Sequence, residues 1–235
     1  MKVEIYSDVV CPWCYIGKMR FERALADFRG RDAVEVVYRP YQLDPNAPKV
    51  SQPPRDYLGR RFGANAVGMQ GAVGRAAASE GITIDWERAI AANTFDAHRL
   101  LQRALREHGS AVQRDLVGRL FDAHFSRGID VGDTVQLVAL ASAAGMDAEA
   151  TRAFLASGEG VAELRQELAA ARGLGVQAVP TFVFDEQYVV EGGQPTPVFA
   201  RVLSELREAH EVEAPAQSAA KGSPNQAVGA GPSAA

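Results

Sequence analysis

The sequence predicts an α/β fold in which a βαβ unit and a ββα unit flank a long all-helical segment. Strand-like runs lie near both ends of the chain, a Cys-x-x-Cys motif opens the first helix, and the middle is rich in Ala, Arg, Leu and Glu. We expect four segments: the βαβ half at 1–54, a helical insertion at 55–172, the ββα half at 173–213, and a disordered tail at 214–235.

The N-terminal half begins with an apolar run, Val3 to Tyr6, which predicts a strand. An amphipathic stretch from Met19 to Phe28 continues the helix that starts at the cysteines. A β-branched run from Asp32 to Tyr38, ending at Pro40, predicts a second strand. The two strands should be parallel, with a right-handed crossover. A loop leaving the sheet is then predicted by four prolines: Pro45, Pro48, Pro53 and Pro54.

Helix signals recur through the insertion. Helix starts are predicted at Asp85, at the capping-box patterns Ser110–Gln113 and Asp133–Gln136, and at Asp147, whose helix should end near Ser157. Helix ends are predicted at Gly109, Gly128 and Gly145. A helical block of this kind between strands is an insertion and not a second βαβ repeat.

The C-terminal half predicts two strands, 179–184 and 188–190, joined by a short polar turn, and therefore an antiparallel hairpin. Thr196 and Pro197 supply an N-cap and a first-turn proline for a last helix that should end near His210. Beyond Ala214 the residues are mostly Ala, Gly, Ser, Pro and Gln, which cannot bury enough apolar surface to fold.

The composition favours a globular cytoplasmic protein. Hydrophobic residues make up 47% of the chain, and the net charge of −4 predicts no nucleic-acid partner. No apolar run approaches the ~18 residues that span a bilayer, so no membrane partner is expected. Because the first strand starts almost at Met1, we expect no secretory leader. In the cytoplasm a lone Cys-x-x-Cys is more often catalytic than structural.

Cys11 and Cys14 are the only cysteines in the 235 residues. Their spacing brings two sulfurs within disulfide reach across one helical turn, and a helix N-terminus favours a thiolate. Pro12 suits the first helical turn. A zinc site would need two further ligands, and the four histidines show no His-x-x-x-His pair; two structural buried thiols are the other alternative. The strand–motif–helix context favours a redox dithiol and no metal.

These motifs together resemble the DsbA-like branch of the thioredoxin superfamily, and within it the FrnE group of dithiol–disulfide oxidoreductases. The resemblance extends over about residues 1–210, and its motifs are specific only as a set. It is carried by Ser7–Gly17, Asn93–Arg99, Gly175–Thr181 and Gly192–Pro195. It implies a thioredoxin fold with the helical insertion between its two halves.

The resemblance also implies the roles of the site residues. Cys11, exposed at the helix start, would attack a disulfide, and Cys14, buried behind it, would resolve the mixed disulfide. Pro180 would follow a cis peptide bond and face Cys11. An extended peptide would bind in a groove lined by Pro12, Trp13, Val179, Pro180 and Thr181.

Other residues have two interpretations. Asn93 and His98 face the active-site cleft in relatives, but His98 is also expected as a surface histidine paired with Asp96 or Glu107. Trp13 either contacts substrate or packs against the insertion. Lys18 is expected to be a solvated surface lysine.

The implied function is a thiol–disulfide oxidoreductase without a cofactor, acting on protein, peptide or small thiols, with glutathione as a possible substrate. The chain would act as a monomer or a homodimer. Two alternatives remain. One is a glutathione-dependent transferase or isomerase of the kappa or chromene-carboxylate isomerase type, although these enzymes commonly have serine at the position of Cys11. The other is a non-catalytic peptide-binding chaperone.

Overall fold

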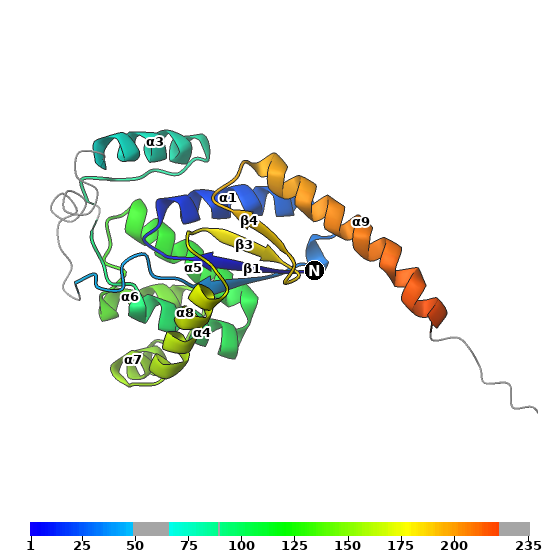
Figure 1. The fold of residues 1–235 in the computed structure, drawn as a ribbon. Coiled ribbons are helices and arrows are strands. Elements are labelled where there is room, and N and C mark those ends of the chain that lie inside the picture. Colours follow the sequence, from blue (N-terminus) through cyan, green and yellow to red (C-terminus); the bar gives the residue numbers. More distant parts are fainter. Residues whose placement is uncertain (49–65, 89, 221–235) are drawn as a thin grey trace, which may run out of the picture.

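The fold is a four-stranded mixed sheet with helices on both faces and a helical insertion between the second and third strands (Figure 1). The computed structural model describes residues 1–48, 66–88 and 90–220. The strands lie in the order β2-β1-β3-β4, with β1 parallel to β2 and antiparallel to β3. Their bounds are β1 Lys2–Ser7, β2 Glu35–Pro40, β3 Thr181–Phe184 and β4 Tyr188–Glu191. The predicted parallel pair and antiparallel hairpin are both confirmed.

Two helices of the terminal halves, α1 (Pro12–Asp27) and α9 (Thr196–Ala220), pack together along the sheet (Figure 1). Their contact is made by Phe21 of α1 and Phe199 of α9, whose rings lie 5.6 Å apart. Phe182 of β3 lies 4.6 Å from the Phe199 ring and 5.5 Å from that of Phe21. All three side chains are fully buried, so this aromatic cluster fixes α1 and its cysteines to the sheet.

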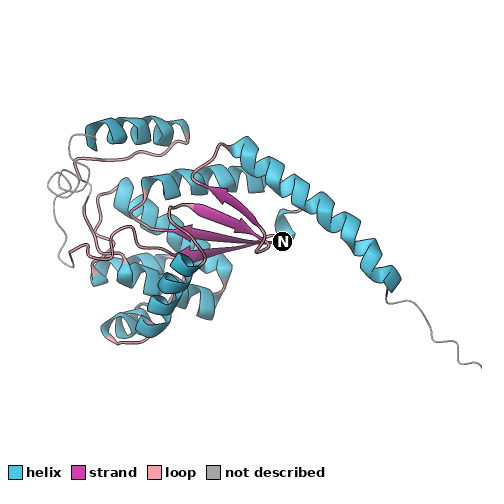
Figure 2. Cartoon of the chain, viewed as in Figure 1, coloured by secondary structure: helices cyan, strands magenta, loops and turns pink. Residues whose placement is uncertain are grey.

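The insertion covers the β2 side of the sheet and the flank of α1 (Figure 2). Tyr15, directly after Cys14, stacks on Phe121 of α5 at 5.1 Å and on Phe125 at 6.0 Å. The insertion therefore packs directly against the helix that carries the motif. Its described helices are α3 Ala66–Ser79, α4 Phe95–His108, α5 Ser110–Phe125, α6 Thr134–Ala143, α7 Ala148–Ala156 and α8 Val161–Gly173, and a 3-10 turn, η1 Arg31–Ala33, precedes β2.

The predicted helix boundaries of the insertion are partly confirmed. Asp133 and Asp147 are N-caps whose carboxylates accept from the backbone N–H three residues on. The predicted glycine stops at 109, 128 and 145 all have positive φ, which glycine adopts without a steric penalty. Pro53, Pro54 and the predicted start of the insertion at 55 lie outside the described residues.

One predicted helix start lacks its capping box, and another does not lead into a helix. Ser110 is the first helical residue of α5 and Gly109 is its N-cap, so the expected capping box does not form. Asp85 caps only a turn, because its carboxylate accepts from the N–H groups of Glu87 and Arg88 but no helix follows. The capping signal is local, whereas helix growth needs a buried face to pack against.

The last helix is longer than predicted. α9 continues through Ala220, past the expected end near His210 and through the first residues of the expected tail. Ala, a strong helix former, recurs in the added stretch and favours the extension, whereas Pro215 within it opposes a helix. The remainder of the expected tail, 221–235, lies outside the described residues.

Candidate active site

Cys11 and Cys14 lie one helical turn apart at the start of α1. Cys11 is the N-cap residue, in extended conformation, and Pro12 occupies the first helical position. The N–H of Cys14 donates to the Cys11 carbonyl at 3.0 Å, which closes the first turn. Both thiols are free. The strand–motif–helix arrangement that the sequence predicts is therefore present.

The sequence analysis expects an exposed Cys11, but the residue is buried. Its exposed fraction is 4%, close to the 2% of Cys14. The cause is the segment before β3: the Cys11 thiol donates to the Val179 carbonyl oxygen, with a distance of 3.6 Å from Sγ to O. Sequence reasoning placed Cys11 correctly at the helix start but had no information on what covers it.

The segment opposite the cysteines contains the Val-Pro-Thr motif. The Val179–Pro180 peptide bond is cis, the conformation that the resemblance implies. The Thr181 hydroxyl donates to the Ala178 carbonyl at 2.8 Å. A Cβ at Gly17 of α1 would lie only 3.0 Å from Cγ of Pro180, so glycine at this position allows the segment to approach the helix. Cys11, Val179 and Pro180 are thus brought together from residues about 170 positions apart.

Trp13 lies between the two cysteines in the sequence and is 38% exposed. A large apolar side chain with this exposure, next to a thiol, is available to contact a bound substrate. The second interpretation, packing against the insertion, fits this exposure less well.

The surroundings of Cys14 favour the protonated thiol. Burial raises the pKa of the Cys14 thiol well above its ordinary value, and the hydrogen bond and charge of Cys11 act in the same direction. The Ser7 hydroxyl and the backbone N–H of Asp8 act in the opposite direction, because they favour the Cys14 thiolate and lower its pKa. Cys14 can therefore attack a mixed disulfide only after a base has removed its proton.

Comparison with known proteins gives the family of this site. A family model described as a DSBA-like thioredoxin domain matches residues 2–204. The chain belongs to the DSBA-like thioredoxin domain family. A crystal structure described as a probable DsbA oxidoreductase from Streptomyces coelicolor is 37% identical, with a TM-score of 0.77, over 97% of this chain and 94% of that one.

Two further similar proteins are more distant in sequence. YwbO of Bacillus subtilis is 27% identical over 208 residues, which cover 86% of this chain and 96% of that protein. A structure of a 2-hydroxychromene-2-carboxylate isomerase is 18% identical with a TM-score of 0.67, over 90% of this chain and 99% of that one. The second likeness shows the fold alone. It also shows that this fold serves more than one chemistry, so the residues must decide the function.

Asp8 and His98 form a buried pair beneath the cysteines of this DsbA-like domain. Asp8 is fully buried and His98 is 3% exposed, and His98 Nε2 lies 3.3 Å from Asp8 Oδ1. The other carboxylate oxygen of Asp8 accepts from the Leu43 N–H at 2.8 Å, and the Asp8 carbonyl accepts from the Cys11 N–H at 2.9 Å. One residue therefore binds both the motif and the histidine.

The expectation that His98 pairs with Asp96 or Glu107 on the helix surface is wrong. Asp96 binds Arg99, and Glu107 binds arginines of its own helix. The sequence reasoning missed Asp8, which directly follows the first strand and precedes Cys11 by three residues. A carboxylate at the end of a buried strand was the available signal.

Asn93 has a structural role among the described residues. Its side-chain amide donates to the Ala47 carbonyl at 2.8 Å, and its carbonyl oxygen accepts from the Phe95 N–H at 3.0 Å. These bonds tie the start of α4 to the segment after β2. The predicted pair is thus divided: His98 binds the aspartate beneath the cysteines, and Asn93 holds the helix on which His98 lies.

Lys18 and His124 also differ from expectation. Lys18 is buried, not solvated, and forms an ion pair with Glu22 at 2.7 Å. His124 of α5 is 4% exposed and was not predicted. Burial lowers the pKa of His124 to about 4, while the charges of Asp8 and Asp130 act in the opposite direction.

The described residues contain neither a metal-ligand cluster nor a membrane-spanning helix. In 1–48, 66–88 and 90–220 no group of three or more His, Cys, Asp and Glu side chains is placed to hold a metal ion. Across the same ranges, no helix combines the length and the apolar character needed to cross a bilayer.

Proposed function

We propose that this protein is a thiol–disulfide oxidoreductase that exchanges disulfides with protein, peptide or small thiol substrates through Cys11 and Cys14. The carrying observation is that two free thiols share the first turn of α1, with the Val179 carbonyl 3.6 Å from the Cys11 sulfur. Membership of the DsbA-like oxidoreductase family supports the proposal.

In the reducing direction, the Cys11 thiolate attacks a substrate disulfide. The substrate S–S bond breaks, a Cys11–substrate disulfide forms, and one substrate thiolate leaves. Cys14 then loses its proton and attacks the Cys11 sulfur. The Cys11–Cys14 disulfide forms, the second substrate thiolate leaves, and two electrons have passed to the substrate. Oxidation of a substrate dithiol is the same sequence reversed.

The substrate would bind along the segment before β3. Within the described residues the Val179 N–H has no hydrogen-bond partner, and the Val179 carbonyl accepts only from the Cys11 thiol. An extended peptide can pair with both groups as an added strand, while Trp13 contacts a neighbouring apolar side chain. In this proposal the peptide takes the place of the thiol at the Val179 carbonyl and uncovers Cys11 for reaction.

Within the family we place the protein in the FrnE group, on the motifs around Cys11, Asn93, Pro180 and Gly193. We propose that it acts in the cytoplasm, as a monomer or a homodimer, on thiol substrates and not on nucleic acid or membranes. The reduction potential of the Cys11/Cys14 pair, measured against glutathione, decides between reductase and oxidase, because 30 mV changes the balance about tenfold for a two-electron couple.

The test compares Cys11→Ser and Cys14→Ser with the wild type. Turnover of a peptide disulfide is measured together with the affinity for the same peptide by calorimetry. We expect Cys11→Ser to abolish turnover and keep the affinity, and Cys14→Ser to accumulate a mixed disulfide visible by mass spectrometry. Unchanged turnover in Cys11→Ser would refute the proposal. A glutathione-dependent isomerisation that survives in Cys11→Ser would support the isomerase alternative, and peptide binding without wild-type turnover would support the chaperone.

A further inference from the structure

A small cavity lies between the ends of β1 and β2 and helices α4 and α5. Its volume is about 10 Å³, and its polar lining includes Ser7, Tyr38, His98 and Gln102. One buried water molecule needs about 10–15 Å³ and two to four polar partners. The cavity therefore has the size and the polarity for a single water.

Three buried polar atoms of this lining have no partner in the part of the chain that the structure describes. They are the Tyr38 hydroxyl oxygen and both side-chain amide atoms of Gln102. Tyr38 is 5% exposed, and its backbone is held by Gln113, which binds the Tyr38 N–H and carbonyl at 2.9 Å each. Buried polar groups are almost always hydrogen-bonded, so unpartnered atoms around one cavity indicate a bound molecule.

The Tyr38 hydroxyl remains a neutral donor. Burial raises the pKa of Tyr38 well above its ordinary value, and the charge of Glu22 acts in the same direction. A hydroxyl and a primary amide together offer donors and acceptors, as water requires. An inorganic anion or cation fits less well, because the unpartnered groups are all neutral.

We propose that this cavity binds one ordered water that links the Cys14 thiol, through the Ser7 hydroxyl, to the His98–Asp8 pair. Ser7 lines the cavity and its hydroxyl lowers the pKa of the Cys14 thiol, and His98 lines the same cavity. The inference rests on the proposed function, because it supplies the proton acceptor that the resolving step needs.

The proton moves without any co-reactant. The Cys14 S–H passes its proton to the Ser7 oxygen, Ser7 passes its own hydroxyl proton to the water, and the water passes one to His98. In neutral His98 the ring proton is on Nε2, because Asp8 lies 3.3 Å from that nitrogen and accepts its hydrogen bond. The other ring nitrogen, Nδ1, therefore accepts the proton from the water. The Cys14 thiolate then attacks the Cys11 sulfur, and the substrate thiolate leaves with the bonding electrons. His98 is thus a positioned base acting through Ser7 and the water.

The charged groups around this path come from several elements. Asp8 faces His98 from the β1–α1 connection, and the charges of Asp8 and Asp130 both act on His124 of α5. Arg39 of β2 lines the cavity but is bound to Glu4 at 2.6 Å. The charges of Glu22, Arg114 and Cys14 act on the pKa of Tyr38. His124 stays neutral above about pH 4, so it does not compete for the proton near neutrality.

The test follows each step separately, with an aromatic disulfide that releases a coloured thiolate. The fast release reports attack by Cys11, and the slow release reports resolution by Cys14. In single-turnover stopped flow we expect Tyr38→Phe, Gln102→Leu and Ser7→Ala to slow only the second release, by about tenfold, at the low end of general-base effects. The solvent deuterium isotope effect on that step should be larger in the wild type, where several protons move together, than in the variants, where one proton moves.

Gln187→Leu is the matched control, because Gln187 is exposed in the β3–β4 turn and the same change there should alter neither release. A second, independent measurement is a high-resolution crystal structure of the wild type, which should show one water bound to Tyr38 and Gln102. Folded variants with an unchanged slow release and isotope effect, or a dry cavity, would overturn the relay. Absence of the fast release in the wild type would instead refute the proposed function.

Discussion

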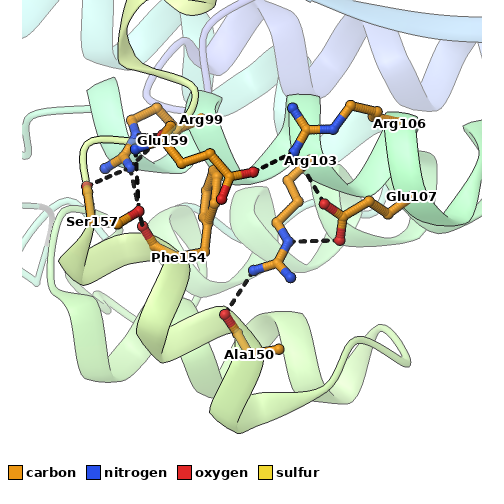
Figure 3. Close-up of polar contacts among 8 residues, drawn as sticks. All are labelled: Arg99, Arg103, Arg106, Glu107, Ala150, Phe154, Ser157 and Glu159. Carbon is orange, nitrogen blue, oxygen red and sulfur yellow. Dashed lines mark hydrogen bonds and ion pairs between the residues drawn. The ribbon is translucent and has the colours of Figure 1, made fainter.

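His98 and Arg99 are consecutive residues of α4, equally buried, and face opposite parts of the molecule. His98 faces Asp8 and the cavity at Tyr38. Arg99 faces the connection between α7 and α8, where its guanidinium binds the carbonyls of Phe154, Ser157 and Glu159 at 2.6–3.1 Å (Figure 3). It also binds the Asp96 carboxylate at 2.7 Å and lies 4.9 Å from the centre of the Phe154 ring.

The difference between the two residues lies in how completely they are satisfied. Arg99 has a partner for every part of its fork, which is typical of a structural clamp. The side chain of His98 has one hydrogen bond, to Asp8, within the described residues, and borders a cavity with unpartnered atoms. Helix α4 thus carries both residues: Arg99, whose hydrogen bonds are complete and stabilise the insertion, and His98, which has hydrogen-bonding capacity left for chemistry.

The largest expected effect is on Arg99. Arg99→Ala removes the donor that the Ser157 and Glu159 carbonyls share and the partner of the Asp96 carboxylate, and should lower the free energy of unfolding by about 3–5 kcal/mol. Chemical denaturation measures this value. Arg106→Ala is the matched control, because Arg106 is half exposed and its partners among the described residues are Glu107 and Glu159, so its loss should cost less than about 1 kcal/mol. Equal losses in both variants would show that Arg99 is not a clamp.

His124 should make the fold sensitive to acid. Because burial lowers its pKa to about 4, the unfolded chain takes up a proton at pH values where the folded one does not. Stability should therefore fall as the pH is lowered from about 6.5 to about 4, by about 3 kcal/mol from this residue. The pH dependence of urea unfolding should become shallower over this range in His124→Phe. An identical slope in the variant would assign the acid sensitivity to other groups.

Gly17 should couple stability to the site. A Cβ at this position would lie 3.0 Å from the Pro180 ring and 3.1 Å from Cα of Gly193, so Gly17→Ala must displace the segment that covers Cys11. We expect a loss of about 1–3 kcal/mol and faster alkylation of Cys11. Gly118→Ala of α5 is the control, since the nearest atom, Nζ of Lys18 at 3.5 Å, is at an ordinary contact distance; the alanine should stabilise α5 by up to about 1 kcal/mol. Loss of stability in both would indicate a general cost of the substitution.

The smallest expected change in stability is at His98, where the kinetic change should be large. His98→Gln retains a donor for Asp8, so the free energy of unfolding should change by about 1 kcal/mol or less. The slow release of the coloured thiolate, which reports attack by Cys14, should slow at least tenfold in this variant, because the glutamine side chain is not a base. Arg99→Lys, if folded, should leave that release unchanged. If His98→Gln leaves the slow release unchanged, His98 is not the base in the resolving step.

The sequence by itself determined the elements and the reacting pair. The strands around the cysteines, the parallel β1–β2 pair, the β3–β4 hairpin and the glycine helix ends follow from local patterns, and local patterns reflect constraints that act on the backbone directly. The Cys-x-x-Cys spacing likewise sets the two sulfurs one turn apart in any helix that starts at Cys11. The Val-Pro-Thr segment could be placed opposite Cys11 only through the family resemblance.

Only the tertiary structure decided the partners of buried polar groups. His98 pairs with Asp8, 90 residues away, because α4 packs behind β1, and nothing in the spacing of Asp96 or Glu107 excludes a local pair. Cys11 and Lys18 are buried by segments distant in sequence, and the cavity at Tyr38 exists only where β1, β2 and α4 meet. The burial and the hydrogen-bond partners of a side chain depend on every element that packs around it. A local sequence pattern describes only the element to which the side chain belongs.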